Sequence, residues 1–398
     1  EICACLVGSE MCIRDSGYVD PKRWDDGVSV LFSNYSFSGS QRHNKNGSDD
    51  ASQYLNMQNG LNLGPWRLRN YSTYSSGDNE QSWDAISTYA ERDIKSLKSQ
   101  FLLGESSTSG DLFPSLPFTG VQLASDDNML PDSQRGFAPT IRGIANSNAE
   151  VTVRQDGYII YQSYVAPGAF EINDLYPSSF SGELQVTVKE ADGTERRFNQ
   201  PFSAVPVMQR PGRFKYSGTL GRYRSNENGD KEPNFAQGTA IYGVSNEITA
   251  YAGTLLSSDY VSGLAGIGFS LLNLGSVSVD ITQAQTTLDN NENSSGQSYR
   301  AQYSKNIETT NTNFSVASYR YSTSGFYDFD EANQSLDDAV QNGHKRSKYQ
   351  LSVNQSLWEG ASFYASAYQQ DYWRDTNKEK NITVGMSSSF YSISYNLS

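Results

Sequence analysis

The chain has 398 residues, of which 36% are apolar and 19% charged, with a formal net charge of −13 and a mean hydropathy of −0.60. No stretch approaches 20 consecutive apolar residues, so membrane-spanning helices are excluded. The acidic balance, with no cluster of Lys and Arg, argues against nucleic acid as a partner.

Residues 1–16 differ in character from the rest of the chain. They contain all three cysteines (Cys3, Cys5 and Cys12) and none of the Ser, Asn and Tyr alternation that begins near Val28. The stretch resembles a translated sequencing adaptor, and it lacks the basic region, apolar core and cleavage site of a signal peptide. We therefore treat 1–16 as a non-native segment and exclude it from fold prediction.

Cysteine and histidine leave little room for site chemistry in the remaining sequence. Beyond Cys12 no disulfide or thiolate site can form. The two histidines, His43 and His344, lie in polar stretches typical of solvated loops. We therefore expect the protein to have no enzymatic activity, no metal site and no cofactor.

From Val28 onward, apolar and polar residues alternate with a period of two. The segments are about ten residues long, which is the usual length of a strand in a membrane barrel. Polar turns such as SSGDNEQ (75–81) separate them. About sixteen such segments are present, which predicts an all-β transmembrane antiparallel barrel with lipid outside and a polar lumen. The predicted lipid-facing residues include Val277, Val279, Ile281, Leu351 and Val353, and the predicted lumen-facing residues include Ser278 and Ser352.

A soluble β-sandwich or an extracellular adhesin would also alternate. Aromatic residues gather near segment ends, as in Tyr319 with Tyr321 and Tyr372 with Trp373, which matches the interfacial girdles of membrane barrels. The polar face also continues through nearly every segment, whereas a soluble sandwich would bury many of its strands on a shared core. Both observations favour the barrel.

The stretch 149–206 breaks the barrel pattern. Its strands are short, and tight turns fall at Asp156-Gly157 and Asp192-Gly193. Pro and Gly in the flanking segments 131–143 and 206–213 interrupt any central strand. We predict barrel strands in 28–143, a small β-sandwich domain in 144–208, and further barrel strands in 209–398. Such an insert must lie in the lumen or in water at one mouth, because lipid cannot satisfy its turns.

One segment has helical periodicity. Ala332, Leu336, Ala339 and Val340 recur at helical spacing with acidic residues on the opposite face, which predicts a helix over 331–341 within a long loop. An acidic solvated loop is the alternative interpretation.

Several motifs closely resemble the outer-membrane fimbrial ushers of the chaperone/usher pathway, of the type 1 pilus kind. They are QLASDDNMLPDSQRGFAPTIRGIA (122–145), GAFEINDLYP and VTVKEADGTERRF in the insert, and VPVMQRPGRFKYSGTLGRYRS after it. GLNLGPWRLRNYSTYS (60–75) and YRYSTSGF (319–326) also look like usher barrel strands. The resemblance runs from about residue 17 to 398.

The resemblance implies a multi-pass barrel in a Gram-negative outer membrane, gated by the insert as a plug. Its partners would be periplasmic chaperone–pilus subunit complexes, pilus subunits and outer-membrane lipid, with neither nucleic acid nor nucleotide involved. Subunits would polymerise by strand addition. In ushers a periplasmic domain precedes the barrel and two follow it; we expect 17–27 to be a remnant of the first and the barrel to be truncated.

The resemblance also assigns site residues. The passage from the sixth strand into the plug would act in gating, with acids and bases neutralising one another; its residues are Asp126, Asp127, Asp132, Arg135 and Arg142. The alternative interpretation of the three aspartates is a pair of catalytic carboxylates or an oxygen-ligand cation site. The hairpin 104–118 would fold inward and hold the plug, through Asp111, Phe113, Leu116 and Phe118; a simple exposed hairpin is the alternative interpretation. The loop helix would brace the plug, through Glu331, Leu336, Asp337 and Val340. None of these groups is expected to be catalytic.

Two other functions fit a barrel with an insert. A plugged outer-membrane transporter usually carries its plug before the first strand, whereas about six strands precede the insert here. A diffusion porin has no folded insert of this size between strands. The sequence alone leaves open which pilus and chaperone would be served.

Overall fold

The computed structural model describes residues 20–42, 50–76, 81–130, 141–155, 158–172, 181–190, 193–203, 207–225, 230–271, 274–288, 292–307, 312–334, 344–358, 361–373, 378–390 and 393–397. The predicted non-native segment 1–16 lies outside these ranges. No described helix is long and apolar enough to cross a membrane.

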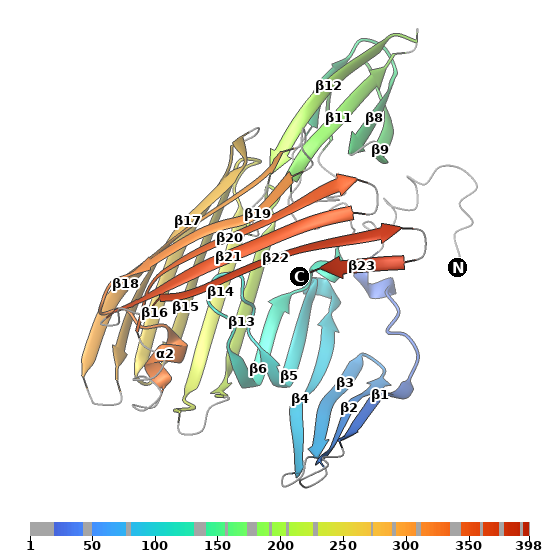
Figure 1. Cartoon of the computed structure of the whole chain (residues 1–398). Coiled ribbons are helices and arrows are strands. Elements are labelled where there is room, and N and C mark those ends of the chain that lie inside the picture. The colour runs from blue at the N-terminus through green and yellow to red at the C-terminus, as the bar shows by residue number, and fades with distance from the viewer. Residues whose placement is uncertain are drawn as a thin grey trace.

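In the described part of the chain, seventeen strands form one large antiparallel sheet, curved into a trough (Figure 1). Each strand pairs with the next in the chain, except that β6 pairs with β13 across an insertion. The sheet confirms the predicted all-β fold. Its first part is β1 (Val30–Arg42), β2 (Asp50–Leu63), β3 (Trp66–Ser76), β4 (Gln81–Ile94), β5 (Ser99–Ser107) and β6 (Pro117–Ser125). Its second part is β13 (Phe214–Tyr223), β14 (Asn234–Gly243), β15 (Ile248–Ser257), β16 (Tyr260–Ser270), β17 (Ser276–Thr287), β18 (Asn293–Ile307), β19 (Thr312–Ser322), β20 (His344–Trp358), β21 (Ala361–Trp373), β22 (Lys378–Phe390) and β23 (Ile393–Leu397).

The two faces of the sheet differ as the alternation predicts. In β17 every even residue from Ser276 to Thr286 is buried on the inner face of the trough, while Val279 and Ile281 stay 42% and 39% exposed on the outer face. Leu351 of β20 is also exposed on the outer face. Ser278, however, is completely buried. Ser278 therefore lies among packed side chains and does not face an open lumen.

The insertion between β6 and β13 forms two small sheets. Strands β7 (Ile141–Ala145) and β10 (Gly168–Ile172) make one; β8 (Ala149–Gln155), β9 (Tyr158–Val165), β11 (Ser181–Lys189) and β12 (Glu195–Ser203) make the other. The two sheets share one apolar core, so the insertion is a β-sandwich. The core residues are Ile141, Ala145, Ala149, Val151, Val153, Ile172, Val186 and Val188.

The sandwich projects past the ends of the large sheet, where β11 and β12 lie against β18 (Figure 1). A carboxylate joins two of its turns: Glu190 accepts hydrogen bonds from the backbone amides of Asn146 (2.9 Å) and Ser147 (2.8 Å) and from Arg196 (2.9 Å). These donors lower the pKa of Glu190 to about 2.

The two ends of the large sheet differ in the length of their connections. At the end where the sandwich is inserted, the connections are short, as at 64–65, 95–98, 244–247 and 271–275. At the opposite end lie the long connections 108–116, 224–233 and 323–343. Outer-membrane barrels have short turns on the periplasmic side and long loops outside, so the sandwich marks the end with periplasmic character.

The segment before β1 is attached to this short-turn end. It contains the 3₁₀ turn η1 (Pro21–Arg23), and the β4–β5 connection contains the 3₁₀ turn η2 (Lys95–Leu97). Lys95 Nζ forms an ion pair with Asp26 (2.5 Å) and donates to the Trp24 carbonyl (2.6 Å).

Candidate functional site

The inner face of the large sheet carries an aromatic cluster beneath a short helix, α2 (Phe329–Asn333). Phe329 is 4% exposed, and its ring packs edge-on against Tyr223 (5.4 Å) and Tyr260 (5.2 Å) and tilted against Phe235 (5.7 Å). These three partners come from β13, β16 and β14. One residue of the loop 323–343 is thereby fixed to three strands of the wall.

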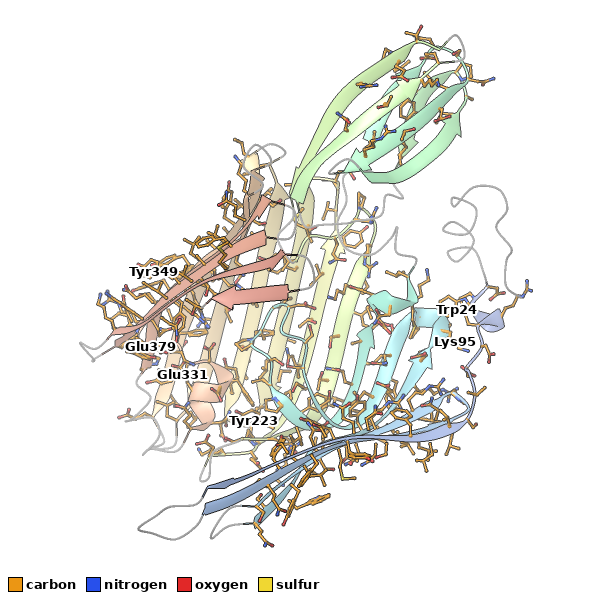
Figure 2. The ribbon with its side chains drawn as sticks, turned by 45° about the vertical axis from the view of Figure 1, so that its right-hand side comes forward. Trp24, Lys95, Tyr223, Glu331, Tyr349 and Glu379 are labelled. Carbon is orange, nitrogen blue, oxygen red and sulfur yellow. The ribbon has the colours of Figure 1, made fainter. Side chains whose placement is uncertain are left out.

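Polar contacts fix the same helix. The Arg320 guanidinium of β19 makes a two-pronged ion pair with Asp328 (2.6 and 3.0 Å), and Tyr223 donates a hydrogen bond to Asp330 (2.7 Å). Burial raises the pKa of the Asp328 carboxyl, but Arg320 outweighs this effect and the net shift is downward. Asp328 and Glu331 also form a capping box, which satisfies the first amides of α2. Figure 2 shows α2 with Glu331 inside the trough, close to Tyr223.

The hairpin that joins β5 to β6 folds onto the same inner face. The Thr108 amide donates to the Leu116 carbonyl (2.9 Å), and the Leu116 amide donates to the Thr108 hydroxyl (3.0 Å), closing the connection into a compact loop. Its predicted apolar anchors are all buried. Phe113 lies directly over Gly253 of β15, where an added Cβ would come within 2.7 Å of the Phe113 ring. These anchors, with their exposed fractions, are Phe113 (6%), Leu116 (3%) and Phe118 (0%); Leu112 (2%), which the sequence did not single out, is buried as well.

An ion pair holds the tip of this hairpin. Asp111 contacts Lys215 of β13 at 2.9 Å and accepts a hydrogen bond from Ser109 (2.6 Å). Burial raises the pKa of Asp111, but the hydrogen bonds from Ser109 and Lys215 together lower it by a larger amount. The net shift of the pKa is therefore downward. The hairpin is therefore attached at its tip as well as at its base.

The hairpin, α2 and the wall enclose a cavity of about 270 Å³. On its wall side Arg300 pairs with Asp280 (2.9 Å), and Tyr251 donates to the same carboxylate (3.1 Å). The cavity has apolar walls from the hairpin and paired charges from the strands. Among the described residues, no group of three or more His, Cys, Asp or Glu side chains could hold a metal ion. The arrangement is suited to holding segments in place within the trough.

The passage from β6 to the sandwich is built differently from the predicted set of acids and bases. Asp126 caps the 3₁₀ turn η3 (Asp127–Met129) by accepting from the Asn128 amide (2.9 Å). Asp127 forms an ion pair with Arg213, which directly precedes β13. Asp132 and Arg135 lie outside the described residues, and of Arg142 only the backbone, in β7, is described. The structure thus joins the two ends of the insertion through a pair that the sequence did not indicate.

The predicted loop helix is only partly described. Glu331 lies in α2, its carboxylate accepting from the Lys345 amide (3.0 Å), whereas Leu336, Asp337 and Val340 fall outside the described residues. Sequence reasoning missed Arg320, Phe329 and Lys215. Only one of these had a local signal: Asp328 and Glu331 have the spacing of a capping box, which places the helix start at Phe329.

A family model described as "Outer membrane usher protein" matches residues 54–398. Among curated relatives, the chain is 57% identical to outer membrane usher protein YraJ of Escherichia coli K12 over 96% of its length, which is 46% of that protein. It is 48% identical to the usher LpfC of Salmonella typhimurium, over 96% of this chain and 46% of that protein. The chain thus spans about half the length of these relatives.

Solved structures agree with the sequence matches. The P pilus usher (PapC) translocation pore matches with a TM-score of 0.62 at 30% identity, over 91% of this chain and 74% of that one. An Escherichia coli P pilus tip assembly intermediate, PapC-PapD-PapK-PapG, matches with a TM-score of 0.67 at 33% identity, over 94% of this chain and 48% of that one. On the strength of these matches, the chain belongs to the family of outer membrane ushers.

Proposed function

We propose that the chain forms part of an outer-membrane translocation pore that passes chaperone-delivered pilus subunits and supports their polymerisation. The observation that carries this proposal is the sandwich inserted between β6 and β13 of a sheet with an apolar outer face. A water-exposed domain between membrane strands must lie in the pore or at its mouth. Here it projects from the short-turn end.

The relatives support the same assignment. One matched structure is a translocation pore, and another holds a usher with PapD, PapK and PapG in an assembly intermediate. We infer that chaperone–subunit complexes of this kind are the partners of the whole protein, with no nucleotide or cofactor required. Each arriving subunit would add a strand to its neighbour, and the pairing itself drives assembly.

The sandwich would gate the pore by moving between two positions. We infer that its place beyond the short-turn end corresponds to the open arrangement, and that it closes the pore by entering the trough. The hairpin 108–116 and α2 narrow the trough and are positioned to contact an entering sandwich. The passage residues Asp126 and Asp127, together with Arg213, form the hinge on which it moves.

The gating proposal is tested by deleting residues 150–204 and joining Ala149 to Val205 in a chain extended to the full length of its relatives. The deletion removes all of β9 to β12 and all of β8 except Ala149, without removing a strand of the large sheet. Conductance in planar bilayers should rise sharply, while pilus assembly should fall. Val279→Ala, on the outer face, is the control and should change neither. Conductance that stayed at its closed level would exclude the sandwich as a gate.

The hinge has its own test. Asp127→Arg and Arg213→Asp each remove the ion pair and should shift the fraction of open pores, and the double exchange should restore it. The effect of either single change should weaken at high salt, because Asp127 is partly exposed and the pair is screened. Single changes without effect on gating would show that the pair has a purely structural role.

A further inference from the structure

The outer face of β17–β22 contains a groove of about 660 Å³ that the proposed pore does not use. Paired residues of neighbouring antiparallel strands share a face, so the strand register identifies what lines it. One row of groove residues is almost wholly apolar: Val277 of β17, Tyr303 of β18, Leu351 of β20, Ala367 of β21 and Ile382 of β22. The next row toward the long-loop end is Val279, Ala301, Tyr319, Tyr349, Gln369 and Lys380.

The polarity of the face changes along the strands. The third row, still closer to the long loops, is Ile281, Tyr299, Tyr321, Ser347, Asp371 and Lys378. Over three successive rows, the β22 position therefore changes from Ile382 to Lys380 to Lys378. An amphiphile with its chains along the first row would place its head group at these two ammonium groups. The aromatic girdle of a membrane barrel does not by itself require this change from apolar to cationic residues along the outer face.

The groove also has a defined aromatic floor. The rings of Tyr319 and Tyr349 lie 4.9 Å apart and remain 39% and 48% exposed. Tyr349 is labelled on this wall in Figure 2. Because both rings are exposed on the outer face, they are available to contact a ligand.

A β-bulge adds a third cation at the head-group end. The register of β20 against β21 shifts between Lys345 and Ser347, which leaves Arg346 as an extra residue. A bulge re-aims a side chain, and here the exposed Arg346 guanidinium lies 4.8 Å from the centre of the Trp373 ring. Asp371 is the acid in the third row, and it is already engaged by Lys378 (3.6 Å) and Ser347 (3.2 Å).

We propose that this groove binds one phosphorylated, multiply acylated lipid of the leaflet on the long-loop side. Its acyl chains would lie on Tyr319, Tyr349 and Leu351, and its phosphate would contact Lys378 and Lys380. The inference rests on the membrane placement proposed above. The inference does not depend on the translocation of pilus subunits, because lipid binding is measured on the chain in detergent. A chain that translocates no subunits can still bind the lipid.

The test is native mass spectrometry of the chain in detergent, titrated with diphosphoryl lipid A, with phosphatidylglycerol and with phosphatidylcholine. Lipid A should be retained most strongly. The double change Lys378→Gln with Lys380→Gln should weaken its binding roughly 30-fold, since each cation near a lipid surface contributes a factor of about five and the two factors multiply. Tyr349→Ala should weaken the binding of every lipid whose acyl chains enter the groove. Lys305→Gln, near the short-turn end of β18, is the matched control.

Three results would overturn the proposal. The first is equal retention of lipid A by the wild-type chain and the double Lys variant. The second is equal retention of phosphatidylcholine and lipid A, which would mean a nonspecific apolar surface. The third is stronger retention of phosphatidylglycerol, which would mean a different class of lipid. Unchanged circular dichroism of each variant ensures that a loss of binding does not come from misfolding, and Tyr349→Ala tests the groove independently of the lysines.

Discussion

Phe329 is the apolar attachment of α2 to the wall, beside the polar contacts of Asp328 and Asp330, so Phe329→Ala should loosen α2. The ring is 4% exposed and contacts Tyr223, Phe235 and Tyr260 at centroid distances of 5.2 to 5.7 Å. Truncating a buried Phe costs about 3–5 kcal/mol, which includes the cavity left behind. The Arg320–Asp328 pair and the capping box remain, so the change removes packing while α2 keeps its cap.

The release can be measured by hydrogen exchange. The Ala332 amide donates to the Asp328 carbonyl (2.9 Å), so its exchange reports the opening of α2. If opening is local, a loss of about 3–5 kcal/mol corresponds to exchange that is faster by roughly two to four powers of ten. Peptides covering 326–334 should show this by mass spectrometry, while those from β8 and β11 of the sandwich should not change.

Val279→Ala is the matched control, because Val279 lies on the outer face and is 42% exposed. Unchanged exchange at α2 in Phe329→Ala would show that the aromatic cluster does not hold the loop. Faster exchange of equal size in the sandwich would show global unfolding, and the local attachment described here would then be refuted.

Two further predictions concern the sandwich and the hairpin. The Asn146 amide and the Ser147 hydroxyl and amide lower the pKa of Glu190 from 4.5 to about 2, so its contribution to sandwich stability is present above about pH 4.5 and is lost as the pH falls toward 2. Amide protection in β11 should fall over this range. The Glu190→Gln variant, which should be less protected at neutral pH, should show no corresponding fall. Gly253→Ala should displace the hairpin, because the new Cβ would lie 2.7 Å from the Phe113 ring, at a cost of about 1–3 kcal/mol. Adding Phe113→Leu should recover part of that loss in thermal unfolding; no recovery would mean that the hairpin does not lie over β15.

The alternation of the sequence was enough to predict the large sheet, because a period of two assigns each residue to a face whatever strand it pairs with. The sandwich was also predictable, since its tight turns and prolines interrupt that period. Neither inference needed a contact between distant residues. The sequence count of about sixteen segments is close to the seventeen strands of the sheet.

The contacts that fix the inner elements were beyond such reasoning. Asp127 and Arg213 are separated by 86 residues, and Tyr223 and Asp330 by 107, so no local pattern connects them. The helix was predicted over 331–341 from apolar spacing, whereas the described helix begins at Phe329, because Asp328 caps it. The inward fold of the hairpin followed from family resemblance, and its fixed position followed only from Gly253, which leaves room for Phe113.

The most direct test of the central claim is to ask which face of the sheet meets water in a membrane. Leu351 and Gln350 are neighbours on β20; Leu351 shares the outer face with Ala367, and Gln350 is paired with Tyr368 on the inner face. With Cys3, Cys5 and Cys12 replaced by Ser, Leu351→Cys and Gln350→Cys are introduced separately, and the chain in lipid vesicles is treated with a membrane-impermeant maleimide. A lipid-facing outer surface predicts rapid labelling at position 350 and protection from labelling at position 351. The protection at 351 should disappear when the vesicles are solubilised and the chain is denatured. Equal labelling of the two positions in intact vesicles would contradict a membrane-spanning pore.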